Sequence, residues 1–191
     1  PLTLDEAGVP YDPSEEHIEV HDTFEGNALA KARYYAARVH YPVFADDSGL
    51  CVDALGGAPG VHSKRWSGRE ALSGDALDAA NNAHLLDVLA TRGAMHAEQR
   101  LARYVCIAAF ADASTTTEAC ARGETGGHIL SHPVGEGGFG YDPYFHSADL
   151  DASFASVSTE AKAAVSHRGR AFRALLEQLD RGTFLPSPVD P

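Results

Sequence analysis

The stretch Phe44-Ala45-Asp46-Asp47-Ser48-Gly49-Leu50 places two adjacent carboxylates between two short apolar runs. Neighbouring side chains of a strand point to opposite faces, so both aspartates can aim at one point only where the strand has turned. We therefore predict short strands at residues 43–45 and 50–54, joined by a turn that presents one carboxylate to a cleft. Carboxylate oxygens are preferred ligands of Mg²⁺, which also bridges to substrate phosphates. A plain Asp-Asp turn is the alternative interpretation.

Outside this stretch, helical and strand patterns alternate along the chain. Apolar residues recur at intervals of three and four in several segments, which predicts helices at residues 27–39, 75–90 and 159–179, the last interrupted near 166–169. Alternating patterns predict an antiparallel pair at 101–110 and 115–121, and a strand-like position for Glu19 within 17–21. Glycine-rich segments at 56–60 and 135–140 are predicted loops. This order favours an α/β fold with a mixed sheet.

The composition is that of a globular domain. Of 191 residues, 44% are hydrophobic and 22% charged, which is enough apolar material for a core. The net charge of -12 argues against non-specific nucleic-acid binding, which needs a basic face, but leaves room for a small anionic ligand where cations converge. The sequence contains no apolar run of the roughly 18 residues that span a membrane. With no secretory signal and an odd number of cysteines, we expect a cytoplasmic protein with reduced thiols.

Two segments pair cations with groups suited to a phosphorylated ligand. Lys31 lies twelve residues after Glu19, and both could be ordinary surface residues. Lys162 precedes Ser166-His167-Arg168-Gly169, where a lysine and an arginine near a helix start can hold anionic oxygens. The alternative for this segment is an exposed basic helix face.

A glycine loop carries two aromatic residues, in the sequence Gly137-Gly138-Phe139-Gly140-Tyr141-Asp142-Pro143. Glycine permits close approach of the backbone to a ligand, and interleaved aromatics can stack on a base. A glycine-rich hairpin whose aromatics fold into the core is the alternative. No Gly-Lys-Ser/Thr ends the loop, so it is not a Walker loop.

In this order and spacing, the motifs resemble those of the inosine triphosphate pyrophosphatase family. The resemblance covers roughly residues 19–180, and its matching segments are TFEGNALAKA (23–32), ADDSGL (45–50), LGGAPGVHSKRWSG (55–68), GGFGYDP (137–143) and EAKAAVSHRG (160–169). It implies an elongated mixed β-sheet flanked by helices, with two lobes around a central cleft, a fold related to that of Maf proteins. It also implies a homodimer.

The resemblance further implies Mg²⁺-dependent hydrolysis of the noncanonical purine nucleoside triphosphates ITP, XTP and dITP to the monophosphate and pyrophosphate. Asp47 is then the catalytic carboxylate, which binds Mg²⁺ or activates water, and Glu19 is a second metal ligand. The residues implied to meet the phosphates are Lys31, Ser48, Lys64, Arg65 and Lys162. Those implied to form the base pocket are Phe139, Gly140, Tyr141 and Asp142, with His167 and Arg168 at the base edge.

The chemistry of Arg168 fits this selectivity in part. Arginine has only donors, so it suits the 6-keto group of hypoxanthine and xanthine and opposes the 6-amino group of adenine. A site built on such a hydrogen bond rejects the wrong partner by roughly 10⁴. Guanine shares the 6-keto group, and the sequence offers no residue for its rejection.

The family's N-terminal strand and Thr/Ser-x-Asn-x-x-Lys phosphate loop have no counterpart in the printed sequence. We expect one domain over residues 1–191, with 183–191 as a C-terminal tail, and expect the natural chain to include the loop. If the loop is absent, the alternative is a nucleotide-binding module with little or no turnover. A Maf-type enzyme for modified pyrimidines is a third hypothesis, which the Phe-Gly-Tyr-Asp and Ser-His-Arg-Gly motifs oppose.

Overall fold

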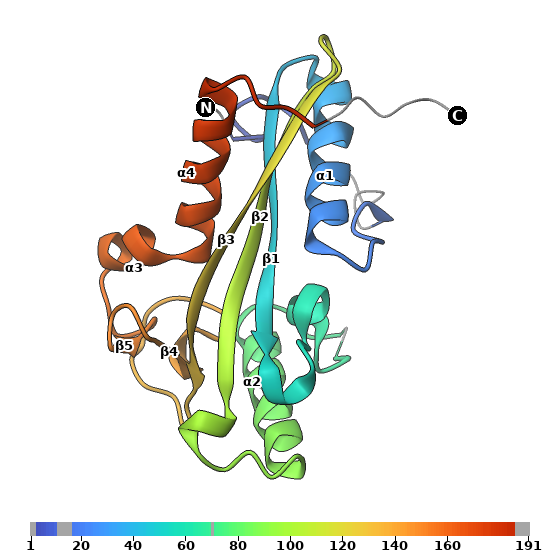
Figure 1. Cartoon of the computed structure of the whole chain (residues 1–191). Coiled ribbons are helices and arrows are strands. Elements are labelled where there is room, and N and C mark those ends of the chain that lie inside the picture. Colours follow the sequence, from blue (N-terminus) through green and yellow to red (C-terminus); the bar gives the residue numbers. More distant parts are fainter. Residues whose placement is uncertain (1–2, 11–16, 70, 186–191) are drawn as a thin grey trace.

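The computed structural model describes residues 3–10, 17–69 and 71–185. In these residues a five-stranded sheet, in the order β1-β2-β3-β4-β5, runs the length of an elongated molecule (Figure 1). The strands are β1 (Val43–Val52), β2 (Leu101–Asp112), β3 (Thr117–Ile129), β4 (Phe145–Ser147) and β5 (Ala152–Ser153). The predicted α/β class and elongated sheet are confirmed. Every strand pairing in the described part is antiparallel, although a mixed sheet was predicted.

The predicted helices are present with slightly different ends. They are α1 (Phe24–Val39), α2 (Gly74–Thr91), α3 (Thr159–Val165) and α4 (His167–Asp180). α1 starts three residues earlier than predicted because the Thr23 hydroxyl accepts a hydrogen bond from the Gly26 amide and caps the helix. The predicted interruption near residue 166 is confirmed: Ser166 ends α3, and its hydroxyl accepts from the Gly169 amide to start α4.

The two carboxylates of the opening stretch lie in the middle of a strand. β1 is unbroken from Val43 to Val52 and pairs with β2 throughout, with Asp46 opposite Ala108 and Asp47 opposite Ile107. The predicted turn is therefore wrong. Ten residues of main-chain pairing with a buried neighbour outweigh the turn tendency of Asp-Asp-Ser-Gly, because both carboxylates find partners on the faces they reach. The predicted strand around Glu19 is also wrong, since this residue lies in an irregular segment before α1.

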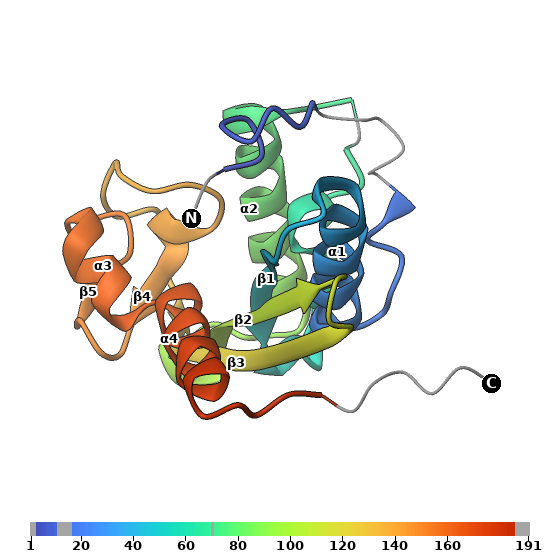
Figure 2. The same ribbon diagram turned by 90° about the horizontal axis from the view of Figure 1, so that it is seen from above.

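Alternation along β2 separates the two faces of the sheet. Val105, Ile107 and Ala109 pack on the side of α1, whereas Cys106 and Ala108 pack against α4. Viewed from above, α1 and α4 accordingly lie on opposite sides of the long strands (Figure 2). Since paired residues share a face, Asp47 faces α1 and Asp46 faces α4.

α4 approaches the sheet closely at a glycine. A Cβ atom on Gly123 would lie 2.2 Å from the carbonyl oxygen of His167 and 2.4 Å from the amide nitrogen of Ala171. The absence of a side chain at this position lets the first turn of α4 rest on β3. It thereby brings His167 and Arg168 toward the cavity described below.

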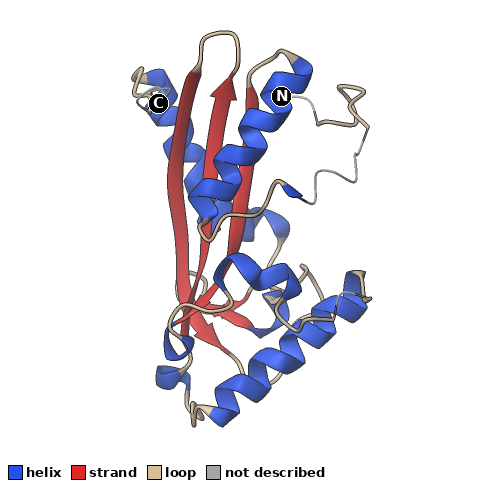
Figure 3. Ribbon diagram, turned by 90° about the vertical axis from the view of Figure 1, so that its right-hand side faces the viewer, coloured by secondary structure: helices blue, strands red, loops and turns tan. Residues whose placement is uncertain are grey.

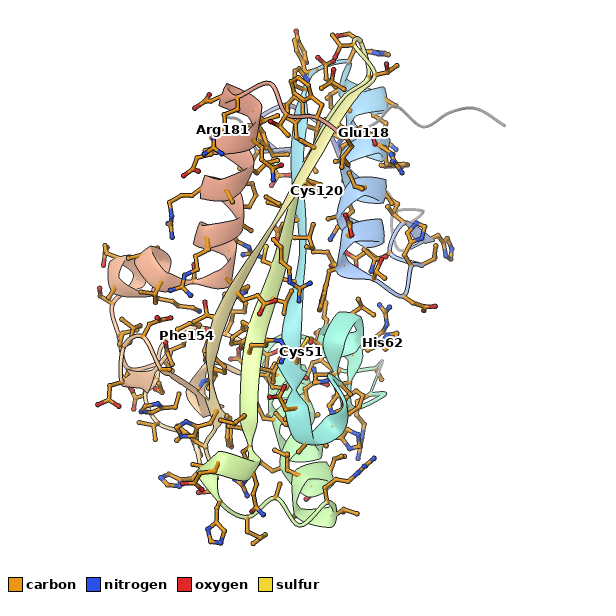
Figure 4. The ribbon with its side chains drawn as sticks, viewed as in Figure 1. Cys51, His62, Glu118, Cys120, Phe154 and Arg181 are labelled. Carbon is orange, nitrogen blue, oxygen red and sulfur yellow. The ribbon has the colours of Figure 1, made fainter. Side chains whose placement is uncertain are left out.

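The half of the molecule that is at the bottom in Figure 1 has its own core. Leu50, Tyr104, Phe145 and Phe154 are buried there with Leu85 and Leu89 of α2. α2 lies along this end of the long strands (Figure 3). Phe154 lies beside the sheet on the side of α3 (Figure 4), and its ring stacks on Tyr104 at 5.8 Å. Within residues 3–10, 17–69 and 71–185, no helix has the length and hydropathy of a membrane span.

The start of the predicted C-terminal tail is anchored. The Leu185 amide donates to the Glu118 carbonyl oxygen at 2.7 Å, and the Leu185 side chain packs on the cluster beneath α1. The remaining tail positions, 186–191, lie outside the described residues.

Candidate active site

A lysine bridges the two carboxylates that were predicted to bind metal. Lys31 Nζ lies 2.9 Å from Glu19 Oε1 and 3.2 Å from Asp47 Oδ1. Asn27, buried in the first turns of α1, donates to Asp47 Oδ2 at 3.2 Å. The spacing of Asn27 and Lys31 by one helical turn places both side chains over β1. The structure thus gathers Glu19, Lys31 and Asp47 on the α1 face of the sheet.

Burial and charge act in opposite directions on these groups. Burial raises the pKa of Asp47, and the ammonium of Lys31 and the amide of Asn27 offset this only in part. For Glu19, burial also acts upward, but the hydrogen bond and charge of Lys31, with the charges of Lys64 and Arg65, leave its pKa lowered. Burial acts to lower the pKa of Lys31, yet the two carboxylates raise it. Lys31 is therefore a fixed cation at neutral pH.

The donor set of this cluster fits Mg²⁺. No cluster of three or more His, Cys, Asp or Glu side chains within the described ranges could hold a metal by itself. Two carboxylates are nevertheless what Mg²⁺ typically takes from a protein, its other ligands being water and substrate phosphate. The ammonium of Lys31, which contacts both carboxylates, shows that one cation can be shared between them.

A cavity of about 620 Å³ opens beside β1. Most of its walls come from the Gly137–Pro143 loop, from α3 and from the start of α4. The predicted binding residues that line it are Ser48, Lys64, Phe139, Gly140, Tyr141, Asp142, Lys162, His167 and Arg168. Glu19, Lys31, Asp47 and Arg65 are not among its lining residues, so the predicted site residues fall into two groups.

The two groups meet at the edge of β1. Gly49 and Lys64 line the cavity, while the charges of Lys64 and Arg65 act on Glu19 on the α1 side. Lys64 belongs to a 3₁₀ helix, Gly60–Arg65, that lies close to β1 because Gly49 has no side chain: a Cβ there would lie 2.3 Å from the Gly60 carbonyl oxygen. A ligand extending from the cavity past Lys64 would therefore approach the carboxylates of Glu19 and Asp47.

The Gly137–Pro143 loop, called the aromatic loop below, is fixed by a buried carboxylate. Asp142 is 2% exposed, forms an ion pair with Lys162 and accepts a hydrogen bond from the Phe139 amide at 2.9 Å. A side chain at position 138 would be strained, since Gly138 has a φ of +75° and a Cβ would lie 2.2 Å from Asp142 Oδ2. The Phe139 ring is 69% exposed, with Lys162 Nζ 4.8 Å from its centroid. This ring is free to stack on a planar ligand.

The opposite wall combines a neutral histidine with a paired arginine. His167 stacks on Tyr104 with ring centroids 4.7 Å apart, and burial together with the nearby cations lowers its pKa to about 3. Arg168 Nε donates to Asp46 Oδ2 at 3.1 Å, and its Nη2 approaches the Ser48 hydroxyl at 3.5 Å. Asp46 thus holds an arginine of the cavity wall.

Sequence reasoning missed the contribution of α2 to this site. Asp78 and Asn81 line the cavity, and Asn81 and Asn82 are 3% and 5% exposed. The sequence does contain a hint. Asn81 and Asn82 lie on the face of the predicted helix that carries Leu85, where apolar residues are expected, and buried polar side chains need specific partners.

Known proteins match the chain over most of its length. The sequence matches the Ham1 family over residues 3–178. It is 49% identical to a dITP/XTP pyrophosphatase of Nocardia farcinica, covering 92% of this chain and 85% of the relative, and 43% identical to one of Ralstonia nicotianae, covering 94% and 86%. Among solved structures, a HAM1 protein from Coxiella burnetii aligns with a TM-score of 0.77 at 33% identity, covering 93% of this chain and 84% of that one. This chain belongs to the Ham1 family.

Proposed function

We propose that this protein hydrolyses ITP, XTP and dITP to the nucleoside monophosphate and pyrophosphate. One observation carries the proposal: a cavity with an exposed aromatic ring and two lysines opens, at the edge of β1, toward a pair of carboxylates on the other face. A nucleotide has the same order of groups, with a planar base at one end and an anionic chain at the other. The relatives named dITP/XTP pyrophosphatase support the same assignment.

The base end is formed by Phe139 and Arg168. The exposed Phe139 ring stacks on the purine, and the guanidinium of Arg168 donates to its 6-keto oxygen. Lys162 is bound to Asp142 and stands over the Phe139 ring, so it adds positive charge where the base joins the phosphates. An adenine 6-amino group would face donors only, which disfavours ATP.

The phosphate end is formed by cations and carboxylates in close contact. Lys31 and Lys64 meet phosphate oxygens, and Asp47 accepts a proton from the attacking water, since its raised pKa makes it a stronger base than an ordinary aspartate. Asp47 and Glu19 would hold Mg²⁺. When bound, the ion neutralises phosphate charge during phosphoryl-oxygen cleavage.

A substrate panel tests the proposal. Pyrophosphate release is measured with ITP, XTP, dITP, ATP and GTP at equal concentration, with Mg²⁺ and with excess EDTA. We expect turnover of the first three far above that of ATP and GTP, and loss of all turnover in EDTA. Equal rates on every purine triphosphate would refute the specificity, and turnover that survives EDTA would refute the metal dependence. Tight ITP binding without pyrophosphate release would support the binding-module alternative.

The assembly state is a separate part of the proposal. We propose that the protein acts as a homodimer in the cytoplasm. Light scattering coupled to size-exclusion chromatography gives the molar mass directly. A mass of one chain at micromolar concentration would contradict the dimer without bearing on the chemistry.

A further inference from the structure

One turn of α2 contacts both walls of the cavity through two buried asparagines and a half-buried aspartate. The side chains come from positions i, i+3 and i+4 of the helix and so share the face toward the cavity and its loops. They are Asp78, Asn81 and Asn82. Burying an amide costs free energy unless it is hydrogen-bonded, so a helix that needed only to pack would carry apolar residues here. The partners of these side chains show what they hold.

Asp78 and Asn82 both form hydrogen bonds with a single residue of the aromatic loop. The Gly140 amide donates to Asp78 Oδ2 at 2.7 Å, and the Gly140 carbonyl oxygen accepts from Asn82 Nδ2 at 2.9 Å. Asn82 Nδ2 also donates to the carbonyl oxygen of Asp78, which fixes its amide plane. Gly140 has a φ of +61° and directly follows Phe139. The α2 pair therefore fixes the backbone that displays the stacking ring.

Asn81 forms hydrogen bonds in the same way with the backbone of the opposite wall, at Lys64 and Ser67. Its Nδ2 donates to the Lys64 carbonyl oxygen at 3.0 Å, and its Oδ1 accepts from the Ser67 amide at 2.8 Å. Its side chain thus pairs with the backbone at the end of the 3₁₀ helix that carries Lys64. Lys64 lines the cavity, and its charge lowers the pKa of Glu19.

We propose that Asn81 and the Asp78–Asn82 pair are positioning residues, each setting one end of the nucleotide site. Asp78 and Asn82 set the base end through Gly140, and Asn81 sets the phosphate end through Lys64. Because all three come from one helical turn, α2 fixes the distance between the two ends. This inference rests on the proposed function for the identity of the ligand. Small displacements of such groups are costly, since site geometry must be held to about 0.5 Å.

The test uses two probes, each of which reports one end of the site. IMP reports the base end, and inorganic tripolyphosphate reports the phosphate end. Binding of each to the full chain with Mg²⁺ is measured by calorimetry, so no turnover is required. Asp78→Ala should weaken IMP about 5- to 10-fold and leave tripolyphosphate within twofold, since one hydrogen bond to a neutral amide is lost. Asp78→Asn keeps an acceptor oxygen and should restore IMP binding.

Asn81→Ala should give the reciprocal result, weakening tripolyphosphate about 5- to 10-fold with IMP within twofold. If this variant does not fold, Asn81→Ser, whose side chain is too short to reach both the Lys64 carbonyl oxygen and the Ser67 amide, tests the same contacts with a smaller loss of volume. Asp87→Ala, exposed on the same helix, is the matched control and should change neither affinity.

The reciprocal pattern is the decisive outcome. If Asp78→Ala and Asn81→Ala weaken both probes equally, the residues support the fold in general and the inference is wrong. Unchanged binding in both variants would overturn it as well. A wild-type protein that binds both probes but releases no pyrophosphate from ITP would refute the proposed function, while the reciprocal pattern would still establish the positioning roles.

Discussion

Replacing either of the adjacent aspartates by asparagine separates their roles, because they lie on opposite faces of β1. Asp47 contacts Lys31 and Asn27 on one face, whereas Asp46 contacts Arg168 on the other. We predict that Asp47→Asn lowers kcat for ITP by about 10²- to 10⁴-fold, the usual contribution of a positioned proton acceptor. Asp46→Asn should cost far less.

The smaller effect of Asp46→Asn follows from exposure. The side chains of Arg168 and Asp46 are 52% and 21% exposed, and their closest approach is 3.1 Å. An ion pair of this kind contributes about 0.2–1 kcal/mol, which corresponds to at most a fivefold change in an equilibrium. The effect should appear mainly in KM, since Arg168 is proposed to bind the base. Equal losses of kcat in the two variants would refute the division of roles.

Asp47→Asn should also change the stability of the protein. Burial raises the pKa of Asp47 above its usual 3.8, so the folded protein holds this proton more tightly than the unfolded chain does. Stability is then lost as the pH rises through the interval above 3.8, and the ionised carboxylate remains unfavourable at neutral pH. Asp47→Asn should therefore raise the free energy of unfolding at pH 7, measured by urea denaturation, and lose that advantage below pH 3.8. A less stable variant at pH 7 would contradict the assigned pKa direction.

Two other features give predictions of their own. Burial lowers the pKa of His167 to about 3, so its NMR ring resonances should not titrate between pH 5 and 8. In the unfolded chain this histidine takes up a proton below about pH 6.5. The stability that His167 contributes should therefore be lost as the pH falls below that value. A titration midpoint near 6.5 would contradict its burial. Gly49→Ala should destabilise the fold by about 1–3 kcal/mol, since its Cβ would lie 2.3 Å from the Gly60 carbonyl oxygen. Gly126→Ala on β3, where a Cβ meets nothing within 4 Å, is the control, and an equal urea midpoint in both variants would show that the Gly49 contact is not tight.

The fold was largely predictable where one local signal dominates. The periodicity of α1 and α2 and the cap at Ser166 mark helices that the structure contains. β1 was misjudged because Asp46-Asp47-Ser48-Gly49 has the composition of a turn, and its strand conformation depends on pairing with β2, some sixty residues away. Pairing at that distance in sequence leaves no trace in a local window.

The candidate site was predictable as a set of residues and not as an arrangement. Motifs identify Asp47, Lys31 and Arg168, but nothing local shows that Lys31 bridges two carboxylates or that Arg168 pairs with Asp46. Asn81 and Asn82 were missed for a related reason. They bind backbone atoms of other segments, and those partners are recognisable only once the chain has folded.

The unbroken path of β1 ties the site to the register in which this strand pairs with β2. A slip of one residue against β2 would turn Asp47 toward α4 and Asp46 toward α1. Depending on the direction of the slip, either Ser48 takes the place of Asp47 beside Lys31, or Ala45 takes the place of Asp46 beside Arg168. A slip of two residues would keep each carboxylate on its face and only move it along the strand. Because that movement is about 7 Å, it separates Asp47 from Lys31 and Asp46 from Arg168, so the site requires the observed register of β1.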